Sequence, residues 1–255
     1  MIVILPPSET KRDGGAHDSS LDLTALGFPA LLAHRRTAVA ALKALSRSVG
    51  DSTIALGLGS TQRAEIDRNR AVTSSPVMPV MDRFTGVLYE ALDAPALDGS
   101  ARDWLAGNVL VHSALFGVIG AADAIPAYRL SHDSRLPGLV LKKHWRDAIA
   151  AQLATAGGVI VDLRSEGYVA LGPAPAPRAG SVYVRVVTPG VDGVKRALNH
   201  FNKKGKGEFV RALALAGNDH STLESLLDWA ESVGIRLERT AALTSDGREI
   251  IDLVV

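Results

Sequence analysis

Two short apolar runs, each bounded by residues that break secondary structure, set the first limits on the fold. Met1–Leu5 stops at Pro6-Pro7, and Val159–Leu163 follows Gly157-Gly158. Short continuous apolar runs between such breakers are typical of buried strands, and proline ends a run because it has no backbone donor. We therefore expect both runs to be strands in a buried sheet.

The remaining pattern alternates further strands with helices. Segment 109–119 is apolar and fits either a strand or a buried helix. Ser221–Glu224 has the spacing of a capping box, and Asp246-Gly247 is a hairpin turn signal. We expect a strand at Ser181–Thr188, a terminal hairpin within 237–255, and helices at Thr37–Val49, from Asp51 to Gly57, 61–72, Leu139–Ala156, Asp192–Leu215 and Ser221–Val233.

The order of these elements indicates the fold class. Strands and helices alternate irregularly, and no repeat or long Pro/Gly/Ser-rich linker divides the 255 residues. We expect a mixed α/β (α+β) fold in a single compact domain spanning residues 1–255.

Composition excludes several classes of function. The chain has no Cys, which excludes disulfide, thiolate and iron–sulfur chemistry, and its His residues are scattered, so we expect no metal and no cofactor. The apolar run from Leu110 to Ala122 is interrupted by His112 and is too short for a membrane span, and no signal peptide is evident. We expect a cytoplasmic protein. The net charge of +1 means that any polyanion site is a local cluster.

One glycine turn has the pattern of a helix–hairpin–helix. Gly57-Leu58-Gly59 stands between two predicted short helices, and Arg63 follows in the second. In such a motif the hairpin amides grip a phosphate of duplex DNA without reading its sequence. Leu58 and Ile66 would then point into the core. The alternative is an ordinary turn before a helix.

Two basic clusters are candidates for phosphate contacts. The denser one, 202–207, contains Lys203, Lys204 and Lys206 with glycines between them, which would let the backbone approach an anion. The second contains Lys142, Lys143 and Trp145, where the indole would stack a base. Its alternative is a core tryptophan on an amphipathic helix.

A polar set follows the predicted strands. Ser165, Glu166 and Tyr168 come directly after Val159–Leu163, and Lys11 follows the first strand. Side chains at strand carboxyl ends line the crevice where α/β proteins bind ligands. Together they offer acid, base and nucleophile groups.

In order along the chain, several blocks resemble the YaaA family of peroxide-stress proteins. The blocks are Pro6-Pro7-Ser8 with Thr10-Lys11, Phe116-Gly117 with Pro126-Ala127-Tyr128-Arg129-Leu130, Trp145 with Asp147, Asp162-Leu163 with Ser165 and Tyr168, and Asn202-Lys203-Lys204 with Lys206-Gly207. The likeness runs from residue 1 to about 215 and beyond.

The resemblance implies a fold peculiar to the family, a basic cleft, a helix–hairpin–helix, DNA binding, and a role in limiting damage by hydrogen peroxide and iron. Carried over position by position, the cleft would contain Lys11, Tyr128, Arg129, Trp145, Ser165, Tyr168, Lys203, Lys204 and Lys206. Where the family often has an acid directly before the tyrosine, this chain has Gly167, and Lys206 replaces the family's arginine.

Two main hypotheses follow. The first is a stress protein that binds DNA, as a duplex or a non-standard structure, through phosphate contacts. The second is an enzyme acting on a nucleotide or a damaged DNA base, by glycosidic-bond or abasic-site chemistry, with Lys11, Glu166 and Tyr128 as catalytic residues. Direct iron binding has only scattered carboxylates to support it. The oligomeric state does not follow from the sequence.

Overall fold

The computed structural model describes residues 1–176, 180–189, 195–196 and 199–255. Its strands are β1 (Ile2–Leu5), β2 (Met78–Pro79), β3 (Val109–Ser113), β4 (Gly117–Gly120), β5 (Ala124–Ile125), β6 (Ile160–Asp162), β7 (Ser181–Pro189), β8 (Lys195–Arg196), β9 (Arg236–Leu243) and β10 (Glu249–Val254). Its α-helices are α1 (Leu32–Leu45), α2 (Val49–Leu56), α3 (Ala64–Arg70), α4 (Val80–Arg83), α5 (Val87–Leu92), α6 (Gly99–Asn108), α7 (Leu141–Ala154), α8 (Glu166–Val169), α9 (Asn199–Ala216) and α10 (Leu223–Ser232). Short 3₁₀ helices are η1 (Pro29–Leu31), η2 (Ser60–Gln62) and η3 (Ala94–Ala96).

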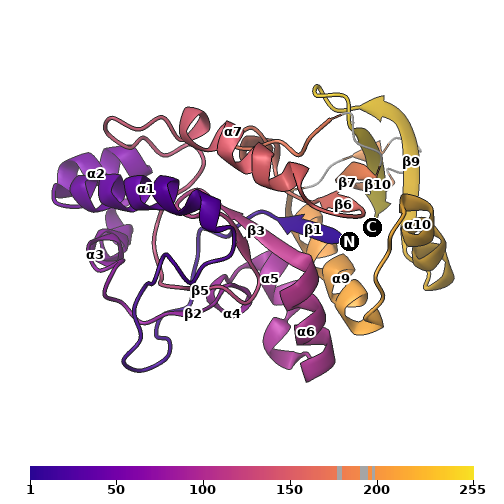
Figure 1. Cartoon of the computed structure of the whole chain (residues 1–255), viewed down its shortest axis with the longest axis horizontal. Coiled ribbons are helices and arrows are strands. Elements are labelled where there is room, and N and C mark those ends of the chain that lie inside the picture. Colours follow the sequence, from indigo (N-terminus) through magenta and orange to yellow (C-terminus); the bar gives the residue numbers. More distant parts are fainter. Residues whose placement is uncertain (177–179, 190–194, 197–198) are drawn as a thin grey trace.

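A twisted mixed sheet runs through the molecule (Figure 1). Its strand order is β4-β3-β1-β6-β7-β10-β9, with β8 paired to β7. The central strands β3, β1, β6, β7 and β10 are parallel, and β4 and β9 are antiparallel at the two ends of that order. Parallel strands are covered on both faces, which explains why β1 and β6 read as continuous apolar runs.

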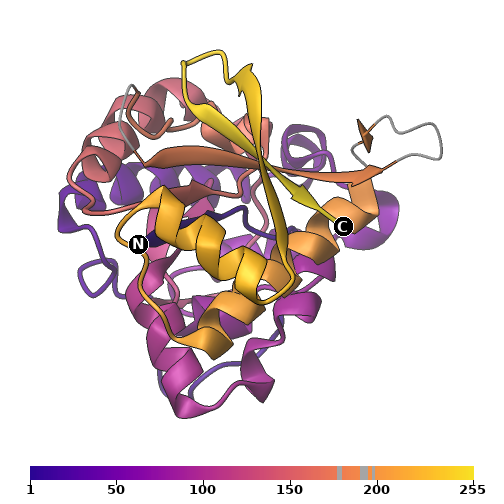
Figure 2. The ribbon, with the colours of Figure 1, turned by 90° about the vertical axis from the view of Figure 1, so that its right-hand side faces the viewer.

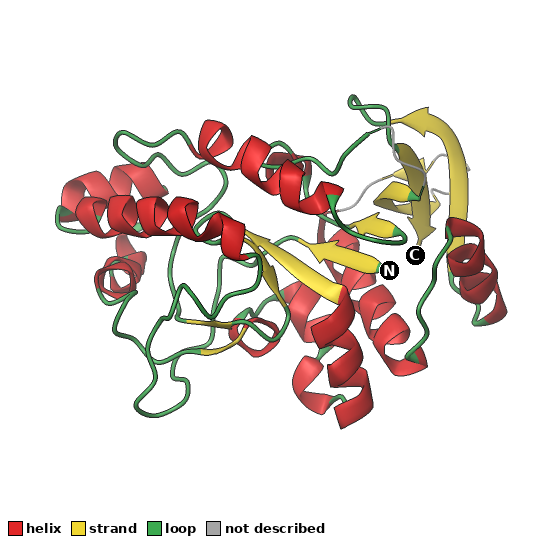
Figure 3. Cartoon of the chain, viewed as in Figure 1, coloured by secondary structure: helices red, strands yellow, loops and turns green. Residues whose placement is uncertain are grey.

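Helices cover both faces of the sheet. In two perpendicular views α1 and α7 lie on one side of the strands, and α5, α6 and α9 lie on the other (Figures 1 and 2). The secondary-structure colouring shows the same layers (Figure 3). Buried side chains of β1, β3 and β6 form the centre of the core. The predicted mixed α/β fold is confirmed.

Most predicted elements are confirmed, with shifts at their ends. Both bounding runs are strands, and 109–119 forms the antiparallel pair β3–β4. The terminal hairpin is present, with Gly247 at φ 84° in its turn.

Most predicted helix boundaries were shifted by a few residues, and three of the shifts have a clear reason or place. The first long helix begins at Leu32 rather than Thr37, because the η1 turn leads directly into it. The cap of α10 is Thr222 rather than Ser221, since the Thr222 hydroxyl accepts from Ser225 N–H at 3.2 Å. The helix predicted from Asp192 begins at Asn199, and residues 192–194 and 197–198 lie outside the described part of the chain.

Among the described residues, no helix combines the length and the apolar character that crossing a membrane requires.

Candidate functional site

The carboxyl ends of three parallel strands meet at one edge of the sheet. β1 lies between β3 and β6, with Val3 opposite Val109 and Ile2 opposite Ile160. The segments that leave this edge carry Lys11, Ser113 and Asp162. Since ligands of α/β proteins bind outside strand carboxyl ends, this edge is the candidate site.

Lys11 is a buried amine without a salt bridge to a described residue. Its residue exposure is 7%, and Nζ donates to the carbonyl oxygens of Ser8 at 3.0 Å and Glu9 at 3.3 Å. Nζ lies 4.2 Å from the ring centroid of Tyr128 and 5.1 Å from that of Phe84. Burial lowers the pKa of Lys11 from 10.5 to about 7, although the charge of Glu65 opposes the shift. A large part of the amine is therefore uncharged near neutral pH.

A buried arginine holds the segment that carries Lys11. The Arg83 guanidinium donates to the carbonyl oxygens of Arg12, Gly14 and Pro76, and Nε donates to that of Ile125. Lys11 also forms a β-bridge with Phe84, the residue after α4. These bonds fix the backbone on which the amine depends for its position.

Tyr128 stands beside Lys11, and a second buried tyrosine, Tyr168, lies close to Tyr128. The Tyr128 hydroxyl is 2.6 Å from the Ser113 hydroxyl, and that Ser113 oxygen also accepts from two backbone amides. Burial raises the pKa of Tyr128 and of Tyr168, so both phenols keep their protons. The Tyr168 ring packs edge-on against His112 and His132. The tyrosines therefore act as hydrogen-bond groups and aromatic walls rather than as bases.

An ion pair lies next to this centre. Arg129, which is mostly buried, pairs with the exposed carboxylate of Glu9 at 2.5 Å. The Asn69 side chain accepts from the Arg129 amide at 2.7 Å and donates to its carbonyl at 2.9 Å. Helix α3 is thereby attached to the carboxyl edge of the sheet.

The end of β6 carries a second buried charge. Asp162 accepts from Arg164 through both carboxylate oxygens, at 2.8 and 2.7 Å, and from Arg248 at 2.8 Å. Burial alone would raise its pKa, but the two guanidinium groups outweigh burial and hold the pKa of Asp162 well below its ordinary value. Arg164 also contacts His112 Nδ1 at 2.8 Å. This centre is a closed charge network.

Comparison with known proteins gives the family. The family model described as "Peroxide stress protein YaaA" matches residues 1–238. A UPF0246 protein of Corynebacterium glutamicum strain R is 39% identical over the full length of both chains. A UPF0246 protein of Streptomyces coelicolor is 35% identical over all of this chain and 98% of its own.

This chain belongs to the YaaA peroxide stress protein family. The resemblance expected from the sequence blocks is therefore confirmed. Of those blocks, the ones around Lys11, Tyr128 and Tyr168 meet at the carboxyl edge of the sheet.

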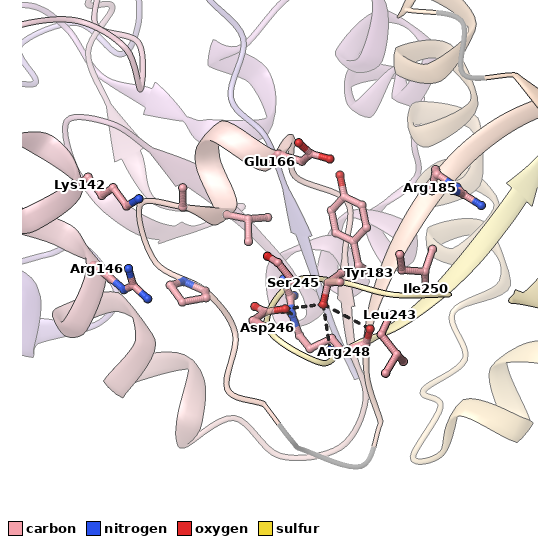
Figure 4. A pocket seen from close by; sticks show the side chains of 14 residues that line it. Lys142, Arg146, Glu166, Tyr183, Arg185, Leu243, Ser245, Asp246, Arg248 and Ile250 are labelled. Carbon is pink, nitrogen blue, oxygen red and sulfur yellow. Dashed lines mark hydrogen bonds and ion pairs between the residues drawn. The ribbon is translucent and has the colours of Figure 1, made fainter. Parts of the chain in front are cut away.

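Glu166 does not join the Lys11 centre. The carboxylates whose charge acts on Lys11 belong to Glu65 and Glu9. Glu166 is exposed, and it lines a cavity of about 530 Å³ together with Lys142 and Tyr183 (Figure 4). The predicted grouping of Lys11, Tyr128 and Glu166 is therefore corrected: the first two are in contact, and the third faces another cavity.

The position before Tyr168 is crowded by the His132 side chain. A Cβ at Gly167 would lie 2.5 Å from the His132 ring. An acid at that position, as the family often has, would displace His132 from Tyr168. The neighbouring Ser165 is exposed at the start of α8.

At the glycine turn, Leu58 and Ile66 are buried as expected. Helix α2 ends at Gly57, whose φ of 62° favours glycine, and Leu58 is buried. Gly57, Gly59 and Arg63 are exposed, and Ile66 of α3 is buried as expected. The Gly59 amide donates to Gln62 Oε1 at 2.9 Å. The Gly57 and Leu58 amides donate to the carbonyl oxygens of Ile54 and Thr53 at 3.3 and 3.0 Å, so the exposed turn has partners within the chain for all three of its amides.

The glycines of the lysine cluster pack a helix rather than approach an anion. Gly205 and Gly207 lie within α9 and are buried. A Cβ at Gly207 would lie 2.1 Å from the Leu88 carbonyl oxygen, and one at Gly205 would lie 2.8 Å from the Val255 side chain. The predicted glycine-lined anion site is corrected to a close contact of α9 with α5 and the sheet.

The three lysines of that cluster separate into two environments. Lys203 and Lys204 are exposed, and Lys204 pairs with Glu208 at 3.2 Å. Lys206 is 5% exposed, and burial lowers its pKa to about 8 while the charge of Asp162 opposes the shift. Lys206 therefore faces the interior and is not available to a phosphate on the surface.

Trp145 is a core residue, which corrects its assignment to base stacking. The side chain is fully buried, and Nε1 donates to the Ala114 carbonyl oxygen at 2.9 Å. Gly117, with φ 69°, leaves room for the indole, since a Cβ there would lie 2.8 Å from it. Lys142 and Lys143 on the same helix are exposed.

The exposed lysines of α7 and α9 lie on different faces of the sheet. Lys142 and Lys143 lie on α7, and Lys203 and Lys204 lie on α9, which covers the opposite face of the sheet (Figures 1 and 2).

Sequence reasoning missed Arg248, Tyr183 and Glu9. Arg248 follows the predicted hairpin turn, and the tertiary structure alone brings it to Asp162. Tyr183 alternates with buried valines on β7, a spacing that places it on the opposite face of the strand.

Proposed function

We propose that this chain acts in the response to peroxide stress by binding DNA through contacts to phosphates. Its family is named for peroxide stress. The DNA would be a duplex or a non-standard structure, and a DNA target would place the protein in the cytoplasm.

One observation carries the proposal: the exposed turn Gly57–Gly59 is attached to the candidate site. Leu58 anchors the turn in the core, and Asn69 at the other end of the motif bonds the backbone of Arg129. A turn fixed in this way holds the segment that carries the exposed Arg63 in place, so Arg63 can meet a phosphate at low entropic cost, since the backbone is ordered before binding.

Exposed cations support the same proposal. Arg63 follows the turn after the short η2 helix, and Lys142, Lys143, Lys203 and Lys204 are exposed on α7 and α9. Because α7 and α9 cover opposite faces of the sheet, we assign the primary contact to Arg63. The α9 lysines would contact a second stretch of DNA.

Binding of a labelled duplex at two salt concentrations tests the proposal. Contacts to about four phosphates would lower the affinity roughly a hundredfold between about 50 and about 200 mM salt. We expect Arg63→Glu to weaken binding more than the double substitution Lys203→Glu with Lys204→Glu. Gln62→Glu, which places a negative charge at the Gly59 amide, should weaken binding as well.

Arg236→Glu is the matched control, because Arg236 is exposed on β9, at the other end of the molecule from α2 and α3 (Figure 1). Binding that does not depend on salt, or that Arg63→Glu leaves unchanged, would contradict the proposal.

A second candidate function rests on the buried amine of Lys11, which faces Tyr128 and whose pKa is lowered to about 7. Such an amine can attack the aldehyde of an abasic sugar, releasing water and forming an imine. Borohydride would reduce that imine to a stable adduct, detectable by electrophoresis of a labelled abasic oligonucleotide. Lys11→Met should abolish the adduct, and its absence with the unaltered chain would eliminate this candidate.

A further inference from the structure

The cavity of about 530 Å³ lies between α7, α8, β7 and the β9–β10 hairpin. Its volume is within the range of roughly 300–1,000 Å³ that holds small ligands. Figure 4 shows Lys142 and Arg146 on one side and Tyr183 with Glu166 across from them. It is separate from Lys11, whose ring contacts Phe84 and Tyr128 do not line the cavity.

The cations around this cavity differ in how far they are neutralised. Arg248 bonds Asp162 and Asp246, and Arg185 bonds Asp252. Within the described ranges, Lys142 and Arg146 have no ion pair or hydrogen bond through their side chains. Two uncompensated cations one helical turn apart, at i and i+4, form a site for an anion of about two charges, such as a phosphate monoester.

The other side of the cavity offers an acceptor and a donor. Glu166 is exposed and has no ion pair with another described residue. Its charge acts on Tyr183, and burial raises the pKa of Tyr183 to about 12. The phenol therefore keeps its proton at neutral pH. A carboxylate of this kind accepts hydrogen bonds from an amino group and repels a carbonyl oxygen.

Apolar groups and one ring lie between these two ends. Val169, Pro173 and Ile250 contribute to the lining, and Tyr183 is the aromatic residue among the lining residues that the structure describes. A sugar phosphate has no apolar face to pack against these side chains and the Tyr183 ring. An acyl chain has no donor for the Glu166 carboxylate. A flat ring with an amino group fits both.

We infer that this cavity binds a nucleotide whose base carries an amino group. The phosphate meets Lys142 and Arg146, the base packs against Tyr183, and its amino group donates to Glu166. The ligand is either a free mononucleotide or one nucleotide unit of a strand with its base turned out. This site goes beyond the duplex contact proposed above and does not depend on it.

Calorimetric titration with AMP, CMP, UMP, adenosine and inorganic phosphate tests the site. We expect AMP and CMP to bind at least tenfold more tightly than the other three probes, since each of these lacks one of the two charge-assisted contacts. Equal binding of phosphate and AMP would overturn the inference, and so would the absence of AMP binding.

Three variants locate the site. Arg146→Ala should weaken AMP about tenfold and leave adenosine unchanged, because it removes only the phosphate contact. Glu166→Gln should remove most of the preference for CMP over UMP, because a glutamine amide also donates to a carbonyl. Tyr183→Leu should weaken every nucleotide. Arg236→Ala on β9 is the control, and an equal loss of AMP affinity in Arg236→Ala and Arg146→Ala would overturn the placement.

A short single-stranded oligonucleotide distinguishes the two sources. If the oligonucleotide competes with AMP and Tyr183→Leu abolishes that competition, the ligand is a nucleotide unit of a strand. If AMP binds and the oligonucleotide does not compete, the ligand is a free nucleotide. Duplex binding without AMP binding overturns this inference alone, and AMP binding without duplex binding overturns the proposed function alone.

Discussion

Two buried ionisable side chains, Lys11 beyond β1 and Asp162 at the end of β6, lie at the same edge of the sheet. Their surroundings are opposite in kind. Ile4 of β1 is opposite Asp162 of β6. Asp162 is fully buried and is held by Arg164 and Arg248. Lys11, beyond the end of β1, is almost as buried, but it faces carbonyl oxygens and an aromatic ring.

This difference in pairing indicates that one centre is structural and the other is suited to chemistry. A buried charge that is fully paired stays charged and holds the elements around it together. A buried amine without an ion pair loses its proton readily, and such perturbed groups concentrate at functional sites. On this basis the Asp162 network supports the fold, and the Lys11 centre is the candidate for chemistry.

The largest expected effect comes from removing the paired charge. Asp162→Asn would leave Arg164 buried without a carboxylate and Arg248 with Asp246 alone, and losing one partner of a buried pair costs about 3–5 kcal/mol. Urea denaturation should show a loss of that size in the free energy of unfolding. Asp246→Asn is the control, since Asp246 is partly exposed and its pair with Arg248 should contribute about 1 kcal/mol or less. Equal losses of unfolding free energy in the two variants would show that the buried Asp162 network stabilises the fold no more than the partly exposed Asp246 pair.

The second expected effect is a dependence of stability on pH that comes from Lys11. Its pKa is about 7 in the folded chain and 10.5 ordinarily, so between these values the unfolded chain binds the additional proton. Stability should therefore rise with pH through this window, by about 2 kcal/mol between about pH 7 and about pH 9. Lys11→Met should lack that rise when unfolding is followed at several pH values.

Asp162 should make the free energy of unfolding depend on pH in the acidic range instead. Its pKa is lowered in the folded chain, so its contribution is present above the ordinary carboxylate range and is lost as the pH falls through the lowered value. A rise above pH 7 that persists in Lys11→Met would mean that another group causes it, and Lys206, whose pKa is about 8, would be examined next.

The smallest expected effect concerns the wall of the Lys11 centre. Tyr128→Phe removes the hydroxyl bonded to Ser113 and keeps the ring that faces Lys11. We expect a loss of about 1 kcal/mol in the free energy of unfolding, the ordinary worth of one hydrogen bond. The rise of stability with pH should remain. Its disappearance would show that the hydroxyl, rather than burial and the ring, controls the Lys11 amine.

Local signals predicted the parts of the site that one strand or one turn carries. Lys11 and Tyr168 follow buried strands, and both lie at the predicted edge of the sheet. Leu58 is buried between two exposed glycines because the spacing of the turn dictates it. The same reasoning failed for Trp145 and Lys206, because a basic sequence context does not show which face of a helix packs inward.

The sequence by itself determined the two buried strands, the mixed α/β class, the terminal hairpin and, through its ordered blocks, the family. These properties follow from local apolar patterns, from turn residues and from motif order. Tertiary structure alone decided that Arg248 meets Asp162, that Glu166 faces Tyr183 rather than Lys11, and that Gly207 packs against Leu88. Each of these contacts joins segments far apart or on different faces of the sheet, and only the complete packing of strands and helices specifies them.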